Sequence, residues 1–378
     1  MVSLFLVVGL IVAAFVGYNI GGSSTGVAFG PAVGSGTLTK MSAAALMTGF
    51  ALLGGATVGT NVIHTMGGRI VPSDQFTLAT SVGVLFFVGL ALLISNMFGV
   101  PASTSMTAVG AIAGLGVATE SLHWAVMGRI MSWWLVSPVV AFWVSSMIGR
   151  YFYPYIAANL AIDSSEGDGR TTRELVGAIL VVAIGCYMAF SAGASNVANA
   201  VAPLVGSDVL GLYQGVLLAG GAIGVGAFTI ARRTLDTVGN DLTDLPITAA
   251  LIVEVISATI ITLLSAAGIP ASLAVSATMS IIGLGWGRAT RTVTLGEVAA
   301  DVAAGEQPDI PGAGEALAAD DTERIDSVPG IGDEDPDSLS PGNLFNPATT
   351  GRVVGLWILT PTLSATGSYL LFRFVPFF

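Results

Sequence analysis

The sequence predicts an all-α, polytopic membrane protein built from two inverted repeats, with broken or re-entrant helical segments and about 10–12 spans. Three observations predict this class: a membrane-like composition, a series of apolar runs of spanning length, and an internal repeat. Of the 378 residues, 53% are hydrophobic and only 10% are charged, whereas a soluble domain carries roughly 25% charged residues. This composition excludes a soluble enzyme and a disordered chain.

Other compositional features exclude further classes. Lys40 is the single lysine, so no basic patch exists to bind nucleic acid. Cys186 is the single cysteine, so no disulfide framework is possible. We also expect no catalytic residues and no cofactor or bound metal apart from possible Na⁺ as a coupling ion, and we expect lipid as the surrounding partner.

Apolar runs of spanning length define the first set of elements, because a bilayer core about 30 Å thick needs roughly 20 apolar residues per helix. Eight runs qualify: 2–20, 42–66, 76–98, 122–148, 174–192, 210–230, 247–267 and 352–372. The first lacks a basic start and a small-residue cleavage site, so we interpret it as a span and not as a signal peptide. The expected location is the cell membrane, with multiple passes.

Four shorter segments rich in Gly, Ser and Thr lie between these runs, at 21–36, 101–116, 193–207 and 270–287. They are apolar but too short to be ordinary spans, so we expect them to be broken or re-entrant. Non-helical backbone survives at membrane depth only where it is buried in protein or lines a polar cavity. These segments are therefore the candidates for a functional site.

The short segments are paired by an internal repeat. Residues 21–35 match 193–207 at an offset of 172, and Pro101-Ala102-Ser103 matches Pro270-Ala271-Ser272 at an offset of 169. Further along, Gly128-Arg129 and Trp134 match Gly351-Arg352 and Trp357 at an offset of 223. The repeat predicts a first membrane repeat at 1–160, a linker at 161–172 and a second membrane repeat at 173–378.

The jump in offset from 169 to 223 marks an insertion in the second repeat. Residues 288–348 hold 13 of the 24 acidic residues against three arginines, and so carry −10 of the net charge of −11. The stretch also contains Pro308, Pro311, Pro329, Pro336 and Pro341, which predicts a solvated and disordered acidic loop. Its acidity and the near absence of lysine are typical of a halophilic protein. A docking segment for a partner is the alternative.

Duplicated halves with Gly-interrupted segments at matching positions are typical of secondary transporters, whose sites lie at the repeat interface near the bilayer midplane. Helix N-termini at such a site offer N–H groups and a positive dipole end to an anion. The alternative is that the small residues only permit close helix packing. Because the short segments are paired at two matching positions, a transport function is favoured over a role in packing alone.

These segments resemble the inorganic phosphate transporter (PiT) family, which has two G-A-N-D-x-A-N signatures, each followed by P-x-S-T-T-H. The corresponding residues are Gly21–Ala28 and Gly193–Ala200 for the signatures, and Pro101–Met106 and Pro270–Val275 for the second element. The resemblance covers both halves apart from the acidic insertion. It implies a symporter that carries phosphate with Na⁺ or protons, and a possible homodimer.

The signatures differ from the family pattern at the positions that the resemblance places at the substrate. The family's Asp is Ser24 in the first copy and Asn196 in the second, and both His positions are apolar, Met106 and Val275. A pocket without carboxylates suits sulfate, which is fully deprotonated and offers only acceptors. Phosphate is the first expectation and sulfate the second.

The predicted substrate-binding residues are the polar side chains of these motifs: Ser23, Ser24, Ser103, Thr104, Ser195, Asn196, Asn199 and Ser272. Ordinary interhelical hydrogen bonding is the alternative role for them. Glu254 lies well inside the run 247–267, and a charge at that depth is a functional hypothesis by default. We expect it to bind the coupling ion, either Na⁺ or a proton, or else to pair with an arginine.

The remaining motif residues have less specific interpretations. Arg129 and Arg352 could neutralise an anion in transit or extend to the membrane interface, and Trp134 is interpreted, with the other tryptophans, as an interface or packing residue. The positive-inside count nearly cancels between the halves, so the orientation stays open. A passive anion channel and a membrane scaffold or sensor are the alternatives to a symporter.

Overall fold

The computed structural model describes residues 4–97, 103–159, 172–230, 246–292 and 347–375, and within these ranges every regular element is a helix. Six of these helices are long and apolar enough to cross a membrane, or seven if one bent pair counts as a span. The predicted all-α, polytopic class is confirmed. The predicted 10–12 spans included the shorter segments as well.

The helices of the first half are α1 (Leu4–Gly34), α2 (Lys40–Ala56), α3 (Gly59–His64), the π-helical η1 (Thr65–Arg69), the 3₁₀ turn η2 (Ser73–Gln75), α4 (Leu78–Met97), α5 (Thr104–Ala118), α6 (Trp124–Tyr151) and α7 (Tyr153–Asn159). Those of the second half are α8 (Thr172–Gly206), α9 (Leu212–Thr229), α11 (Ile247–Ala266), α12 (Leu273–Ala289), the 3₁₀ turn η4 (Thr290–Thr292) and α15 (Pro347–Phe374).

The two signature segments are not broken, contrary to the sequence prediction. Each continues the apolar run before it as one helix, α1 with 31 residues and α8 with 35. At 1.5 Å per residue α1 is about 46 Å long, more than the bilayer core of about 30 Å. The glycines at 21 and 193 therefore do not interrupt the helix; they allow another backbone to approach it.

The break lies instead in the run 42–66, which the sequence predicts as one span. The chain bends by 58° between α2 and the α3–η1 pair, because Thr57 takes a non-helical conformation with ψ of −89°. The helices α5 and α12 do start within the molecule, as predicted for two of the four short segments. Each begins directly after a serine N-cap, at Ser103 and Ser272.

The two halves are interlocked by glycine contacts that occur in repeat-related pairs. A Cβ on Gly21 of α1 would overlap the carbonyl of Ile223 in α9, and a Cβ on Gly193 of α8 would overlap the carbonyl of Ala51 in α2. The two glycines are separated by the repeat offset of 172, and so are the two carbonyl residues, Ala51 and Ile223. Each signature helix thus packs closely on the helix that follows the other signature.

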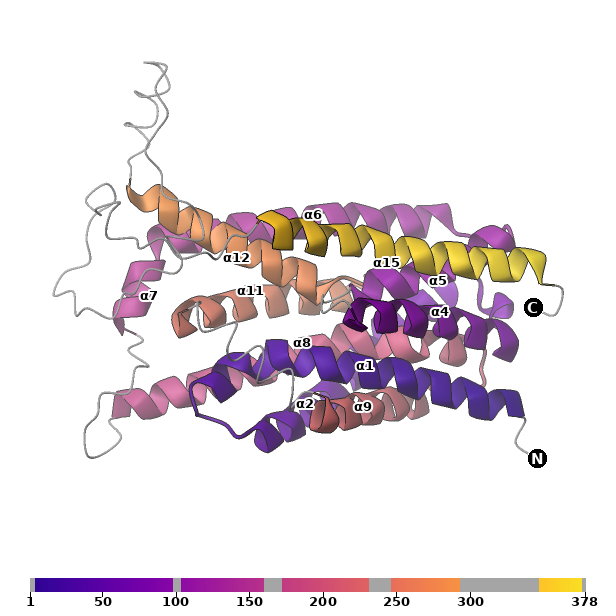
Figure 1. The fold of residues 1–378 in the computed structure, drawn as a ribbon, viewed down its shortest axis with the longest axis horizontal. Coiled ribbons are helices and arrows are strands. Elements are labelled where there is room, and N and C mark those ends of the chain that lie inside the picture. The colour runs from indigo at the N-terminus through magenta and orange to yellow at the C-terminus, as the bar shows by residue number, and fades with distance from the viewer. Residues whose placement is uncertain (1–3, 98–102, 160–171, 231–245, 293–346, 376–378) are drawn as a thin grey trace, which may run out of the picture.

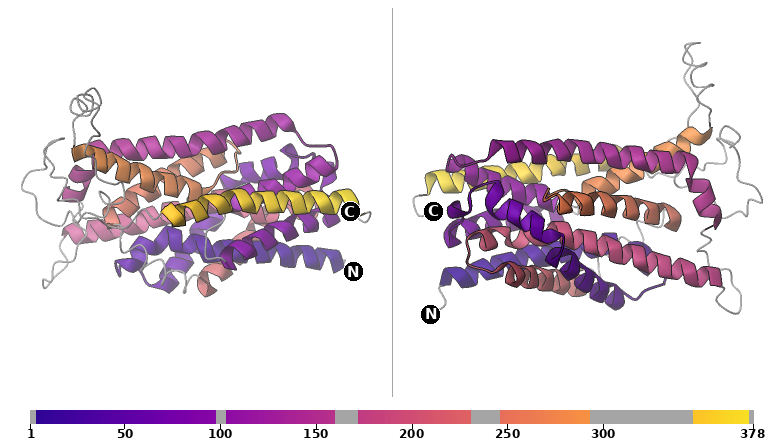
Figure 2. Two further views of the ribbon diagram at one scale, coloured as in Figure 1. Left: turned by 45° about the horizontal axis from the view of Figure 1, so that its top comes forward. Right: turned by 180° about the vertical axis from the view of Figure 1, so that it is seen from behind.

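The same reciprocal packing occurs between the later helices of the two halves. Gly114 of α5 faces the carbonyl of Ala365 in α15, and Gly283 of α12 faces that of Phe142 in α6. In both cases a glycine of one half and its repeat equivalent in the other half face carbonyls that are themselves repeat equivalents. In Figure 1 the equivalent helices α1 and α8 run in opposite directions, and Figure 2 shows the long helices lying side by side. Inversion across a bilayer stays a prediction.

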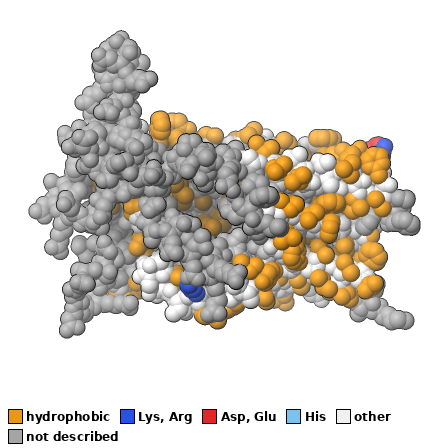
Figure 3. Space-filling model, viewed as in Figure 1, with side chains coloured by type: hydrophobic (Ala, Val, Ile, Leu, Met, Phe, Trp, Pro, Cys, Tyr) orange, Lys and Arg blue, Asp and Glu red, His pale blue; other side chains and the backbone are white. Residues whose placement is uncertain are grey.

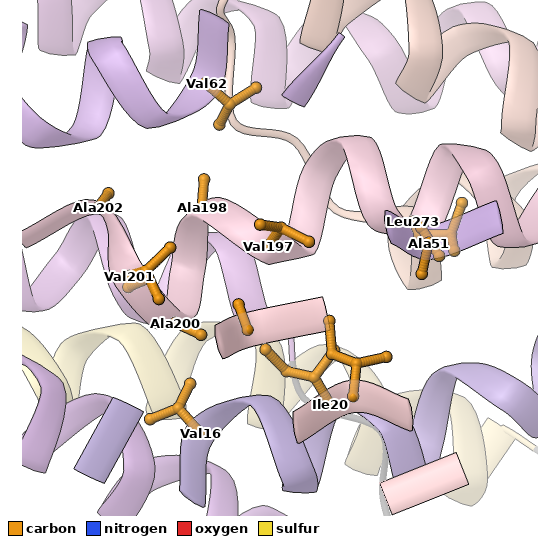
Figure 4. Packing of buried hydrophobic residues seen from close by; sticks show 14 of the residues in the cluster. Val16, Ile20, Ala51, Val62, Val197, Ala198, Ala200, Val201, Ala202 and Leu273 are labelled. Carbon is orange, nitrogen blue, oxygen red and sulfur yellow. The ribbon is translucent and has the colours of Figure 1, made fainter. Parts of the chain in front are cut away.

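The helix α8 lies at the centre of the hydrophobic core. Its residues Val197 and Val201 are fully buried, and Figure 4 shows this part of α8 between Val62 of α3 and Ile20 of α1. The outer surface is also apolar. Side chains along α6 such as Leu135 and Trp143 are mostly exposed, and Figure 3 shows hydrophobic side chains across the visible described face, as a lipid-facing surface requires.

Two predicted segments fall largely outside the described residues: the linker 161–172 and most of the acidic loop 288–348. The start of that loop is corrected, because residues 288–289 complete α12 and 290–292 form η4. Arg288 and Arg291 are buried there. Arg291 donates to the carbonyl of Arg150 at 2.9 Å, and the Arg288 guanidinium lies 4.6 Å from the centre of the Tyr153 ring.

Candidate functional site

Hydroxyl and amide groups of α8 and α5, all buried except for the half-buried Thr104, form one polar cluster. Thr104 donates to Asn196 Oδ1 at 2.6 Å. The Asn199 amide nitrogen lies 3.1 Å from Ser105 Oγ, 3.1 Å from Asn196 Oδ1 and 3.3 Å from Thr104 Oγ1. We call Thr104, Ser105, Ser195, Asn196 and Asn199 the polar cluster.

Ser195 joins the polar cluster to the second half of the fold. Its hydroxyl lies 3.2 Å from Ser105 Oγ in the first turn of α5 and donates to the carbonyl of Ala271 at 2.8 Å. Ala271 directly precedes Ser272, the N-cap of α12. One side chain of α8 therefore touches the starts of both internal helices.

The two N-cap serines lie beside the polar cluster and are buried. The hydroxyl oxygen of Ser103 accepts from the backbone N–H of Met106, and that of Ser272 accepts from Val275. Other N–H groups in the first turn of a helix lack acceptors within the helix, and the dipole there favours an anion. The starts of α5 and α12 are thus suited to bind an oxyanion.

The hydroxyl protons of the polar cluster are committed to protein acceptors. Ser195 uses its single proton on Ala271, so Ser105 donates to Ser195, and Thr104 donates to Asn196. In this conformation these hydroxyls order the site and do not donate to a ligand. Asn199 Oδ1 is different: it is buried and has no hydrogen-bond partner among the described residues. It is an open acceptor for a protonated oxyanion or a cation.

The predicted residues of the first signature do not join this network. The Ser23 hydroxyl donates within its own helix, 3.1 Å from the carbonyl of Ile20, and Ser24 is buried in α1. Val27 stands at the repeat position of Asn199, and Leu273 and Ala274 stand where the first half has Thr104 and Ser105. The duplicated fold therefore carries this network on one side, because the other copy lacks the side chains.

Glu254 is buried in α11, three residues before Ser257, whose hydroxyl is 3.4 Å from Ser280 of α12. Its carboxylate forms no hydrogen bond or ion pair with any residue that the structure describes, so the predicted arginine partner is not found there. No hydrogen bond or ion pair within the described residues connects it to the polar cluster, which contains no carboxylate. It is a separate buried ionisable group in the second half.

Sequence reasoning missed Ser105 and the residues that hold the turn between α11 and α12. Ser105 could have been found, because it follows Thr104 in the P-x-S motif and lies in the first turn of α5. Trp134 donates from Nε1 to the carbonyl of Pro270 at 2.8 Å, and Asn61 donates to that of Ala266 at 3.0 Å. Their role depends on tertiary contacts that no local pattern reports.

Two helices that start within an all-helical membrane protein, and meet at a buried polar cluster between duplicated halves, define the class of membrane transporters. Comparisons identify the family. The model of the phosphate transporter family matches residues 20–368. The chain belongs to this family and is a multi-pass membrane protein, so the resemblance seen in the motifs is confirmed.

Individual relatives differ in their named substrates. The sulfate permease CysP of Bacillus subtilis (strain 168) is 32% identical over 277 residues, which are 73% of this chain and 76% of the relative. Among solved structures, one described as the sodium-dependent phosphate transporter matches with a TM-score of 0.70 and 18% identity, over 98% of both chains. At this identity the match shows a shared fold.

Proposed function

We propose that the protein is a secondary active symporter that carries inorganic phosphate across the cell membrane, driven by a sodium or proton gradient. The observation that carries the proposal is the convergence of the starts of α5 and α12 on Ser195. The first turn of α5 and the residue before the N-cap of α12 both contact this one side chain, and helix N-termini near such a point would supply a positive potential and N–H donors for a dianion without a fixed positive charge.

The open acceptor favours phosphate as the substrate. Near neutral pH phosphate retains at least one proton, and Asn199 Oδ1 is a buried acceptor without a partner among the described residues. A buried acceptor left without a donor is costly, so a protonated oxyanion would be retained over one with no proton. The family's name points to the same substrate.

Sulfate is the second candidate, and a different observation favours it. The polar cluster has Asn196 where the resembled family signature has Asp, and so offers no carboxylate to accept the phosphate proton strongly. A site without a carboxylate repels a fully deprotonated anion less than a site that contains one. The 32% identical relative is named a sulfate permease.

The coupling ion is assigned to Glu254. A carboxylate at membrane depth is costly unless it is neutralised, and Glu254 has no ionic partner among the described residues. It is therefore neutralised by a proton or by a cation such as Na⁺. Its position in α11, packed on α12, would connect the coupling ion to the helix whose N-terminus faces the anion.

The test is uptake of radiolabelled phosphate and sulfate into proteoliposomes that contain the purified full chain. We expect saturable phosphate uptake that requires an inward sodium or proton gradient and stops when an ionophore collapses it. Sulfate uptake that excess phosphate fails to inhibit would favour the second candidate. Uptake that follows the anion gradient alone would indicate a channel, and uptake of neither anion would overturn the proposal.

A further inference from the structure

The turn between α11 and α12, residues 267–272, is held by donors from three other helices. Ser195 of α8 and Trp134 of α6 donate to adjacent carbonyls of the turn, those of Ala271 and Pro270, each at 2.8 Å. Asn61 of α3 donates to Ala266 at 3.0 Å, directly before the turn. The turn therefore has a fixed position, although it contains Gly268 at φ +69°.

Fixing this turn also fixes one wall of the candidate site. Ser272, the last residue of the turn, is the N-cap of α12, and Ser195 connects the turn to the polar cluster. If the bonds from Trp134 and Ser195 were broken, the start of α12 would separate from α8 and α5. Trp134 is thus a positioning residue, because its indole N–H bonds to a carbonyl of the turn and to no side chain of the polar cluster.

Both donors have counterparts in the repeat: Trp357 corresponds to Trp134, and Ser23 corresponds to Ser195. The hydrogen bonding of these counterparts differs from that of Trp134 and Ser195. Trp357 Nε1 is buried and has no acceptor among the described residues. The Ser23 hydroxyl bonds back to its own helix. The equivalent donors therefore bond to a turn between two other helices on one side, and on the other side they make no bond between helices within the described residues.

Asymmetry of this kind is what a carrier with two related halves requires, because exchanging the conformations of the halves produces the opposite-facing state. A buried indole N–H without an acceptor is unfavourable. It is tolerated in one state if a second state satisfies it. Packing alone does not account for retaining a tryptophan donor where a phenylalanine would leave no unpaired group.

We propose that Trp134 and Trp357 are alternating latches of the transport cycle. In the observed state Trp134 holds the α11–α12 turn and Trp357 is released; in the opposite-facing state Trp134 is released and Trp357 is bonded. The proposal rests on the alternating access of the proposed function, but it concerns the conformational equilibrium and can be measured without substrate.

The experiment measures the accessibility of the turn in purified full-length protein. Cys186, the single cysteine, is replaced by Ala, and Ser272→Cys provides one thiol that is buried in the observed state. Its rate of modification by a soluble maleimide reports the fraction of molecules in which the turn is released. Trp134→Phe and Trp357→Phe are then added singly and together.

We expect opposite changes from the two substitutions. Trp134→Phe removes a bond of the observed state only, so the modification rate rises about fivefold, the shift that one hydrogen bond supports. Trp357→Phe removes a bond of the other state only, so the rate falls by a similar factor. The double variant returns toward the starting rate.

Trp133→Phe is the matched control, because Trp133 lies beside Trp134 on α6 with a partly exposed side chain and should leave the rate unchanged. Changes in the same direction for Trp134→Phe and Trp357→Phe, or no change for either, would overturn the latch proposal. Opposite shifts in a protein that transports neither anion would retain the latches and reject the proposed substrate.

Discussion

Asn199 organises the polar cluster at the scale of single residues. Its amide nitrogen is within 3.3 Å of three oxygens but carries only two protons, so the bonds to Thr104, Ser105 and Asn196 cannot all be made at once. The hydroxyls around it are ordered by their own acceptors. A small change in the position of α5 relative to α8 therefore redistributes these bonds and exposes different donors.

Replacing Asn199 with Ala tests this role. The substitution leaves the oxygens of Thr104 and Ser105 without their shared donor in a buried site, so we expect the free energy of unfolding to fall by about 1–3 kcal/mol and uptake to be lost. Thermal unfolding in detergent and proteoliposome uptake measure the two effects. Ser132→Ala, which removes a bond within exposed α6, should change neither; wild-type uptake by Asn199→Ala would remove Asn199 from the site.

Replacing Asn196 with Asp tests substrate selection. The substitution restores the carboxylate of the resembled signature, which accepts a proton from phosphate but repels sulfate, since sulfate offers only acceptors. We expect the ratio of phosphate to sulfate uptake to rise about tenfold or more, measured by competition between the labelled anions. An unchanged ratio would show that Asn196 does not face the anion.

At the scale of elements, close helix packing and not helix breaking explains the signature glycines. The sequence places small residues at 21 and 193 but does not say which effect they have, because both a break and a close approach require the absence of a Cβ. The answer depends on the carbonyls of Ile223 and Ala51 in other helices. The break at Thr57 was missed for the same reason: Gly54, Gly55 and Gly59 flank it, but these glycines could equally serve close packing within one continuous span.

Gly193→Ala and Gly21→Ala should each separate a helix pair. A methyl group at either position overlaps a backbone carbonyl that belongs to another helix, so we expect losses of about 1–3 kcal/mol in the free energy of unfolding, as for other overpacked sites. Gly221→Ala in α9, where no atom lies within 4 Å of the added Cβ, is the control. It should be neutral or slightly stabilising, and equal behaviour of all three variants would contradict the packing role.

At the scale of the whole molecule, the sequence was sufficient for the all-α membrane class, whereas the division into halves and the roles of the site residues stay predictions. Composition predicted the membrane-spanning helices, and the motifs placed Thr104, Ser195, Asn196 and Asn199 in one group, although their role in transport stays a prediction. The sequence did not predict that Ser23 and Ser24 lie outside this group. A repeat implies equivalent positions but not equal conformations, and that difference exists only in the folded protein.

Deleting residues 293–346 tests whether the acidic insertion takes part in transport. The offsets of the repeat mark it as an addition to the second half, so a chain in which a short Gly-Ser linker replaces it should retain uptake within about twofold, in keeping with the tolerance of domains to changes in loop length. Proteoliposome uptake, normalised to the amount of inserted protein, is the measurement. Loss of uptake with normal thermal unfolding would favour the scaffold or sensor hypothesis.

The exchange of helices between the halves has a consequence for biogenesis. While the ribosome is still synthesising the second half, the helices of the first half lack their packing partners. In the folded protein α1 packs on α9, α2 on α8, α5 on α15 and α6 on α12. These contacts join residues far apart in sequence, which slows folding and leaves intermediates with uncovered faces. The N-terminal half should therefore remain sensitive to protease after its insertion and become resistant only when the last helix has emerged.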